Sequence, residues 1–174
     1  LETGEPQEKV REQLEFDLQE TLKAAMESWQ AMRRNEGKHM EEDLLGHLAS
    51  YRGRLDEIRS LWPGARDEAL RSMGTRLQAL LDQGGWRLDE ARFAQEAAVL
   101  ADRWDVAEEL SRSESHMAQF RSVMAEDGGV GRKLDFLVQE MNREINTMGS
   151  KVSDGRICWL VVEAQADLER MREQ

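Results

Sequence analysis

Cysteine, proline and aromatic residues are all scarce in this chain of 174 residues, and each shortage excludes something. A single cysteine, Cys158, can form neither an internal disulfide nor a cysteine-rich zinc site. Two prolines and an aromatic content of 6% are typical of a helical composition. No apolar run approaches the roughly 18 residues of a membrane span. We therefore expect a soluble, cytoplasmic, helical protein that does not bind a membrane.

The charge balance narrows the possible partners without naming one. The formal net charge of −11 argues against a broadly basic surface for nucleic acid. A local basic strip remains possible, and abundant carboxylates are the ligands that divalent cations prefer. Composition alone therefore leaves the function open.

Apolar residues recur every three or four positions along most of the chain, which predicts amphipathic helices. The first run extends from about residue 8 to 61 and favours one long helix with a soft point at Gly37, although two helices placed end to end also fit. Pro63 is expected to end this element, because proline has no backbone N–H to donate. Five shorter helices are predicted to follow, two of them with Asp89 and Asp154 as N-caps.

No segment alternates with period two over a useful length, so no sheet is predicted. The expected fold is all-α, with a long helical hairpin or extended helix followed by a small C-terminal helical bundle. We expect a helical arm at residues 1–88 and a C-terminal helical domain at residues 89–174. A chain this small cannot bury both faces of so long a helix, which suggests oligomerisation or an arm that reaches a partner.

The predicted helix at residues 105–124 carries one polar stripe, formed by Asp105, Glu109, Arg112 and His116. Carboxylates and an imidazole suit Mg²⁺ or Mn²⁺. Arg112 can bind a phosphate through two donors, and His116 can transfer protons near neutral pH. Glu108 lies beside the stripe and can join it. The same stripe also fits an ordinary helix surface, with Asp105 as N-cap and Glu109–Arg112 as a surface pair.

The predicted helix at residues 131–151 has an unusual number of amides. One stripe contains Asp135, Gln139, Asn142 and Asn146. Asparagine is a mediocre helix former, which indicates a face selected for hydrogen bonding. Such a face can contact the bases and 2′-hydroxyls of RNA, or it can form a polar seam between helices or subunits. The residues alone favour the seam.

Three runs of sequence resemble a single protein family. GRKLDFLVQEMNREINTMGSK, at 131–151, is similar to the C-terminal signature of the YicC/YloC family of bacterial endoribonucleases. LADRWDVAEELSRSESH, at 100–116, resembles its R-x-D-V-x-E-E-x-x-R-L-x-S-H segment, and MRRNEGKHMEEDLLGHL, at 32–48, resembles its R-x-x-E-G helix. Ser113 departs from the family's leucine, and Trp104 stands where a small residue is usual.

This resemblance implies a metal-dependent endoribonuclease that hydrolyses RNA, rather than DNA, as a ring-like homo-oligomer, namely a hexamer. It also implies a strand-rich N-terminal domain with no counterpart here, so we expect the chain to be the helical and C-terminal portion. The alternative is an α-helical module for oligomerisation or RNA binding without catalysis.

Combined with the polar stripes, the resemblance assigns three groups of residues. The expected catalytic residues are Glu108, Glu109 and His116. The expected ligands of a divalent Mg²⁺ or Mn²⁺ ion are Asp105, Glu109 and His116. The expected RNA-binding residues are Arg112, Lys133, Gln139, Asn142, Arg143, Asn146 and Lys151.

Overall fold

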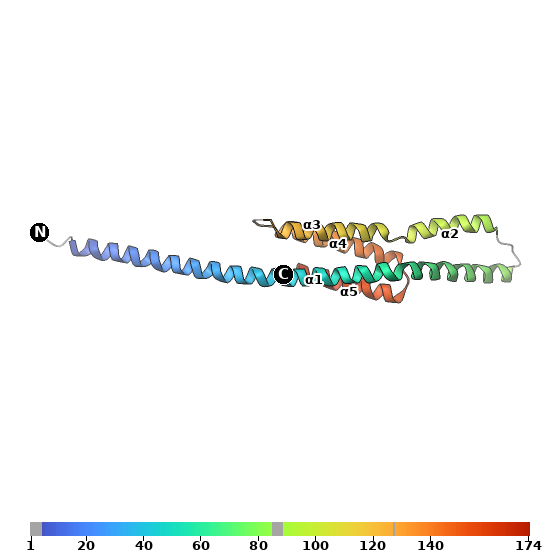
Figure 1. The fold of residues 1–174 in the computed structure, drawn as a ribbon, viewed down its shortest axis with the longest axis horizontal. Coiled ribbons are helices and arrows are strands. Elements are labelled where there is room, and N and C mark those ends of the chain that lie inside the picture. Colours follow the sequence, from blue (N-terminus) through green and yellow to red (C-terminus); the bar gives the residue numbers. More distant parts are fainter. Residues whose placement is uncertain (1–4, 85–88, 127) are drawn as a thin grey trace. The chain divides into compact units, whose positions relative to one another are not determined.

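A computed structural model of the chain describes residues 5–84, 89–126 and 128–174, and each regular element in these ranges is an α-helix (Figure 1). The helices are α1 (Glu5–Gly84), α2 (Glu90–Trp104), α3 (Ala107–Met124), α4 (Gly131–Lys151) and α5 (Gly155–Arg172). The predicted all-α fold is confirmed. None of these described helices combines the length and apolar content that crossing a membrane requires.

The predicted helix end at Pro63 is wrong, because α1 continues through Pro63 as far as Gly84. A proline inside a helix removes one hydrogen bond and crowds the preceding turn, at a cost of about 3 kcal/mol. Trp62 and Ala65, on either side of Pro63, are both buried in the core at 8% exposure. We attribute the continuous helix to this burial, which offsets the cost. The first two predicted helices are therefore one element, which leaves five described helices instead of six.

The predicted N-caps are confirmed at two helices. The carboxylate of Asp89 accepts hydrogen bonds from the backbone nitrogens of Ala91 and Arg92, at 3.1 and 3.2 Å. The carboxylate of Asp154 accepts from the backbone nitrogens of Arg156 and Ile157, at 2.9 and 3.4 Å. These caps satisfy amide donors that the first turn of a helix leaves unpaired.

The third predicted cap, Asp105, lies just outside α3. The N-cap position of α3 is occupied by Val106, which makes no side-chain capping bond. Asp105 instead follows the last residue of α2, and its carboxylate accepts a hydrogen bond of 3.0 Å from the backbone nitrogen of Ala107. Asp105 thus supports the junction between α2 and α3 without being the cap itself.

A glycine turn separates α3 from α4. Gly128 has a φ of 105°, a conformation that residues with a Cβ rarely adopt. The turn lets α3 and α4 pack against each other.

The chain divides into two compact units, Leu1–Glu42 and Asp43–Gln174, so that α1 contributes to both. The boundary expected from the sequence lies between residues 88 and 89, at the edge of the stretch 85–88 that the structure does not describe. That division into an arm and a C-terminal domain stays a prediction.

The core of the second unit is built from one segment of α1 together with α3, α4 and α5 (Figure 1). Helix α4 packs against both α3 and α5. The largest fully buried side chains are Leu48, Tyr51, Leu55, Ile58, Phe120, Met141, Ile145, Met148, Ile157 and Leu168. Each such side chain contributes about 1.5–3 kcal/mol of hydrophobic stabilisation. The predicted apolar stripes of α3, α4 and α5 therefore form the core.

The first unit presents an apolar stripe that its own residues do not cover. The stripe consists of Val10, Leu14, Leu18, Leu22, Met26, Trp29 and Met32, each of which is 50–69% exposed. We call these seven residues the N-terminal stripe.

Candidate functional site

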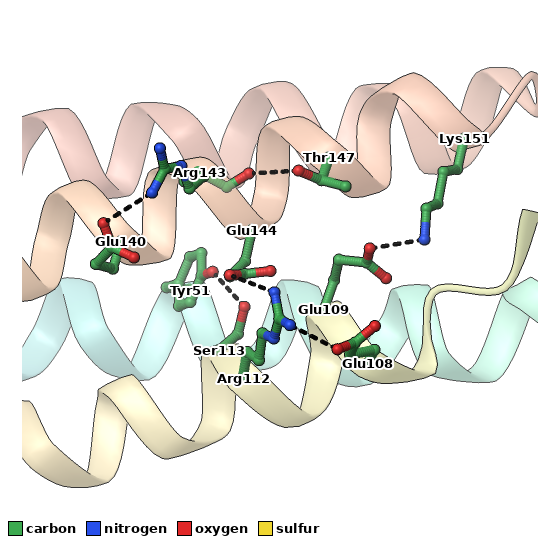
Figure 2. A network of polar contacts seen from close by, with 10 residues as sticks. All are labelled: Tyr51, Glu108, Glu109, Arg112, Ser113, Glu140, Arg143, Glu144, Thr147 and Lys151. Carbon is green, nitrogen blue, oxygen red and sulfur yellow. Dashed lines mark hydrogen bonds and ion pairs between the residues drawn. The ribbon is translucent and has the colours of Figure 1, made fainter. Parts of the chain in front are cut away.

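The polar faces of α3 and α4 meet in a group of charged side chains, which Figure 2 shows from close by. We define the α3–α4 cluster as Glu108, Glu109, Arg112, Glu144 and Lys151. The first three lie on α3 and the last two on α4. Four of the five were predicted site residues, and the cluster brings them together.

Glu109 and Lys151 form the first ion pair of the cluster. The ammonium of Lys151 lies 2.6 Å from Oε1 of Glu109 and donates a second hydrogen bond, of 2.7 Å, to the backbone carbonyl of Asp105. The Glu109 side chain is only 8% exposed and that of Lys151 24%. Lys151 thereby connects the end of α4 to the start of α3.

Arg112 joins two carboxylates in the second part of the cluster. Its guanidinium lies 2.6 Å from Oε1 of Glu108 and 3.7 Å from Oε1 of Glu144. Glu108 is exposed, whereas the Glu144 side chain is 6% exposed. Arg112 itself is more than half exposed, so one guanidinium holds a buried carboxylate while remaining open to solvent.

A buried polar contact lies beneath Glu144 (Figure 2). The hydroxyl of Tyr51 is 3.1 Å from the hydroxyl of Ser113 and 3.3 Å from the backbone carbonyl of Met141. Burial raises the pKa of Tyr51, the Ser113 hydrogen bond lowers it, and the charge of Glu144 raises it further. The net rise keeps this phenol protonated, so it serves as a neutral support for the two helices.

Two buried carboxylates in one cluster are more charge than packing alone requires. Removing a charged group from water costs several kcal/mol, and a buried ion pair rarely stabilises more than an apolar pair of the same size. Oε2 of Glu109 is buried with no hydrogen-bond partner. Groups of this kind concentrate at functional sites, where their charge has a chemical use.

The predicted metal ligands do not gather in the structure. Among the residues that the structure describes, no three His, Cys, Asp or Glu side chains lie close enough to hold an ion. Glu109 is occupied by Lys151, and Asp105 contacts Lys151 through its backbone. His116 follows Glu109 by seven residues, or roughly 10 Å along a helix. Within one chain, Asp105, Glu109 and His116 therefore do not fit a preformed metal centre.

His116 is half-buried, and its Nδ1 is buried without a hydrogen-bond partner. The stripe of α3 thus separates into an inner part at Glu109 and a distant imidazole two turns further along. The catalytic role expected for His116 stays a prediction.

The predicted RNA-binding residues of α4 fall on different faces. The amide of Asn146 donates to Oδ1 of Asn142 at 3.4 Å, and the amide of Gln165 on α5 donates to Oδ1 of Asn146 at 2.5 Å. Asp135 of the same stripe pairs with Arg172 of α5 at 3.5 Å. This amide stripe therefore forms a polar seam between α4 and α5.

The other three predicted RNA-binding residues of α4 have local partners. Gln139 donates to Asp135, Arg143 pairs with Glu140 on its own helix, and Lys133 pairs with Glu126. Lys133, Gln139 and Arg143 are exposed. Their proposed contact with RNA stays a prediction.

Sequence reasoning missed a second polar group, on the contact between α1 and α5. Asp167 is 4% exposed, and its carboxylate lies 3.7 Å from Nδ1 of His47 and 3.3 Å from Nη1 of Arg170. Tyr51 and Ser113 were missed in the same way. His47 and Asp167, like Tyr51 and Ser113, come from helices far apart in the sequence, so no local spacing indicates these contacts.

Comparison with known proteins agrees with the sequence resemblance. The family model described as "Endoribonuclease YicC-like, C-terminal" matches residues 58–174. A protein of Clostridioides difficile named probable endoribonuclease YicC is 38% identical over 157 residues, which are 90% of this chain and 53% of that protein. A protein of Haemophilus influenzae with the same name is 35% identical over 170 residues, or 98% of this chain and 58% of that protein.

The chain thus spans a little over half the length of these curated relatives. The family match covers the whole of α2 to α5 and enters α1 at Ile58, so it includes every member of the α3–α4 cluster. The protein belongs to the YicC-like family of endoribonucleases.

Proposed function

We propose that the chain is the helical and C-terminal portion of an endoribonuclease, and that it hydrolyses RNA phosphodiester bonds at the α3–α4 cluster. The observation that carries this proposal is the pairing of two buried carboxylates, Glu109 and Glu144, with two cations that reach solvent, Lys151 and Arg112. The names of the family and of the two relatives supply the class of reaction.

The two cations are the proposed contacts of the scissile phosphate. A guanidinium offers paired donors to phosphate oxygens, and an ammonium offers a compact charge. Both cations also offset the chain's net charge of −11, which otherwise repels a polyanion. We expect the affinity for RNA to fall with rising salt concentration, as it does wherever phosphate contacts contribute.

Glu109 is the proposed proton acceptor. In the free protein its Oε1 is held by Lys151. A phosphate that binds Lys151 competes for the same ammonium and frees Oε1 to accept a proton from the attacking water. General base catalysis of this kind contributes about 10²–10⁴-fold to a rate. Arg112 is proposed to hold the phosphate and its developing negative charge, and Glu108 is proposed to position Arg112 through their 2.6 Å contact.

No step is assigned to a metal ion, because the residues expected to bind it do not gather in one chain. The need for Mg²⁺ or Mn²⁺ stays a prediction from the family resemblance. Cleavage with either ion, and with a chelator in its place, tests that need independently of the role of Glu109.

The deciding experiment measures cleavage of a labelled structured RNA by this chain. We expect Glu109→Gln to slow cleavage by about 100-fold or more. Glu114→Gln is the matched control, since Glu114 lies on the exposed side of α3 and pairs with Arg59. Equal cleavage by the two variants, with both folded by circular dichroism, removes the cluster from the mechanism. A DNA of the same sequence tests the expected preference for RNA.

A second candidate function is assembly without catalysis, and the N-terminal stripe favours it. Seven exposed apolar residues on one helix face exceed what a monomer usually leaves open. We propose that another copy of the chain covers this stripe, and the hexamer implied by the family resemblance stays a prediction. Sedimentation should show an oligomer that Leu22→Glu dissociates and Gln19→Glu does not. RNA binding that depends on salt but yields no product would support this alternative to cleavage.

A further inference from the structure

A cavity beside the α3–α4 cluster has walls that fit a nucleotide. It has a volume of about 200 Å³ and lies where α1, the end of α2 and the loop between α4 and α5 meet. A second cavity, of about 460 Å³, adjoins it and shares Trp104, Ser153 and Asp154 as lining residues. Together they reach the size of ordinary small-ligand sites, which is about 300–1,000 Å³.

Two tryptophans line the first cavity, Trp62 from α1 and Trp104 from the end of α2. Aromatic side chains bind unpaired nucleobases by stacking, whatever the base.

Trp62 also has an unused hydrogen-bond donor. The side chain is 8% exposed, and its Nε1 is buried without an acceptor. A buried donor with no partner is rare in folded proteins. Because solvent does not reach this nitrogen, the indole ring must tilt to meet an acceptor on a ligand.

Two cations line the same cavity, Lys151 and Arg66. Lys151 is the residue whose ammonium holds Glu109, so the cavity adjoins the proposed cleavage site directly. Asp154 also lines the cavity. Hydrogen bonds from the Arg156 side chain lower the pKa of Asp154 to about 2, so this wall stays negative. A phosphate is therefore expected near Lys151 and Arg66, away from Asp154.

From these walls we propose that the cavity binds one nucleobase of the RNA strand, adjacent to the phosphate held by Lys151. The base stacks on Trp104, Trp62 donates to it through Nε1, and Arg66 binds a neighbouring phosphate. The choice of RNA as the ligand rests on the proposed function, whereas the shape and chemistry of the cavity do not.

Tryptophan fluorescence during titration with adenosine 5′-monophosphate tests this assignment. We expect saturable quenching by the nucleotide and none by ribose 5-phosphate, which lacks the base. Trp104→Leu should weaken binding about tenfold or more, as the loss of one stacking partner does. Trp62→Phe keeps most of the packing and should weaken binding about threefold to tenfold, as the loss of one hydrogen bond does.

Trp159→Phe is the matched control, because Trp159 is 64% exposed on α5 and does not line the cavity. It should bind the nucleotide like the unchanged chain. Quenching by ribose 5-phosphate equal to that by the nucleotide would reassign the cavity to phosphate and overturn the proposal. Unchanged affinity in Trp104→Leu, with the variant still folded, would overturn it too.

The same proteins in the RNA cleavage assay separate the two proposals. Nucleotide binding that Trp104→Leu abolishes, in a chain that cuts no RNA, would support the base site and contradict the proposed reaction. Cleavage with an unchanged KM in Trp104→Leu, and no quenching that depends on the base, would support the reaction and contradict the base site.

Discussion

The two units of this protein use the same helical periodicity with opposite results. Over residues 8–42 the apolar residues of α1 are exposed, whereas six apolar residues of the same helix are buried in the core with residues of α3, α4 and α5, namely Leu48, Tyr51, Leu55, Ile58, Trp62 and Ala65. The spacing that makes a helix amphipathic is therefore independent of what covers its apolar face. A buried stripe shows a partner within the chain, and the exposed stripe is the face that we propose another copy covers.

Substituting one leucine of α1 in each unit should give the largest difference in the free energy of unfolding. Leu55 is 1% exposed and Leu18 is 67% exposed. We expect Leu55→Ala to lower the free energy of unfolding by about 2–5 kcal/mol, because it leaves a cavity in the core. Leu18→Ala should change it by less than about 0.5 kcal/mol in the dilute chain. Urea denaturation measures both, and a large loss in Leu18→Ala that grows with protein concentration would show that another copy covers the N-terminal stripe.

Breaking an ion pair should also lower the stability more in the second unit than in the first. Lys151→Met leaves the carboxylate of Glu109 buried without its cation, and we expect a loss of about 2–3 kcal/mol. This expected loss is smaller than the loss for a fully buried ion pair, because the Lys151 side chain is 24% exposed. Arg11→Met removes the exposed pair with Glu15 in the first unit and should cost less than about 1 kcal/mol.

Thermal unfolding of the two variants provides the comparison. Equal losses would mean that the pair between Glu109 and Lys151 is solvated like a surface pair. That result would also weaken the argument that its charge is kept for chemistry.

Tyr51 provides a test that only the second unit can supply. Tyr51→Phe removes a hydroxyl and leaves the Ser113 hydroxyl and the Met141 carbonyl buried without it, for an expected loss of about 1–2 kcal/mol. Ser113→Ala in the Tyr51→Phe background should cost less than in the unchanged chain, since the two hydroxyls share one interaction.

The stability of the unchanged chain should also depend on Tyr51 at alkaline pH. Burial raises the pKa of Tyr51 above its usual 10.0, so the unfolded chain loses this proton first. The stabilising contribution is complete below pH 10 and is lost as the pH rises through the folded pKa. Over that window the unchanged chain should lose about 1.4 kcal/mol per pH unit more than Tyr51→Phe. Parallel pH profiles for the two proteins would contradict the burial of the phenol.

These contrasts explain which parts of the fold the sequence could predict. Helix spacing and the caps at Asp89 and Asp154 depend on residues close in sequence, and both were predicted. The continuation through Pro63 depends on Trp62 and Ala65 meeting other helices, which no local pattern reveals. Local chemistry predicts where helices form, and tertiary packing decides where they end.

The same distinction between local sequence and tertiary packing applies to the candidate site. Glu109, Arg112 and Lys151 were identified as residues, but their pairing across α3 and α4 required the structure. Asp105, Glu109 and His116 do not gather within one chain, because a stretch of twelve residues spreads them over about three helical turns. Their role as metal ligands stays a prediction. The sequence showed Ser113 only as a departure from the family's leucine, whereas in the structure it is fully buried and hydrogen-bonded to Tyr51, a residue 62 positions away.

The smallest expected effect concerns a single helix cap. Asp154→Ala removes the acceptor for two backbone donors at the start of α5, and we expect a loss of about 1 kcal/mol. Asp17→Ala, in the first unit, removes an exposed contact with Gln13 and should cost less than about 0.5 kcal/mol.

The pKa of Asp154 is lowered from 3.8 to about 2, so the stabilising contribution of this cap is present above pH 3.8 and lost as the pH falls towards 2. Acid unfolding is followed by circular dichroism. The unchanged chain should begin to unfold above this pH range only if other carboxylates are protonated first. The difference between the unchanged chain and Asp154→Ala must shrink across that window, and a constant difference would mean that the cap does not depend on the charge of Asp154.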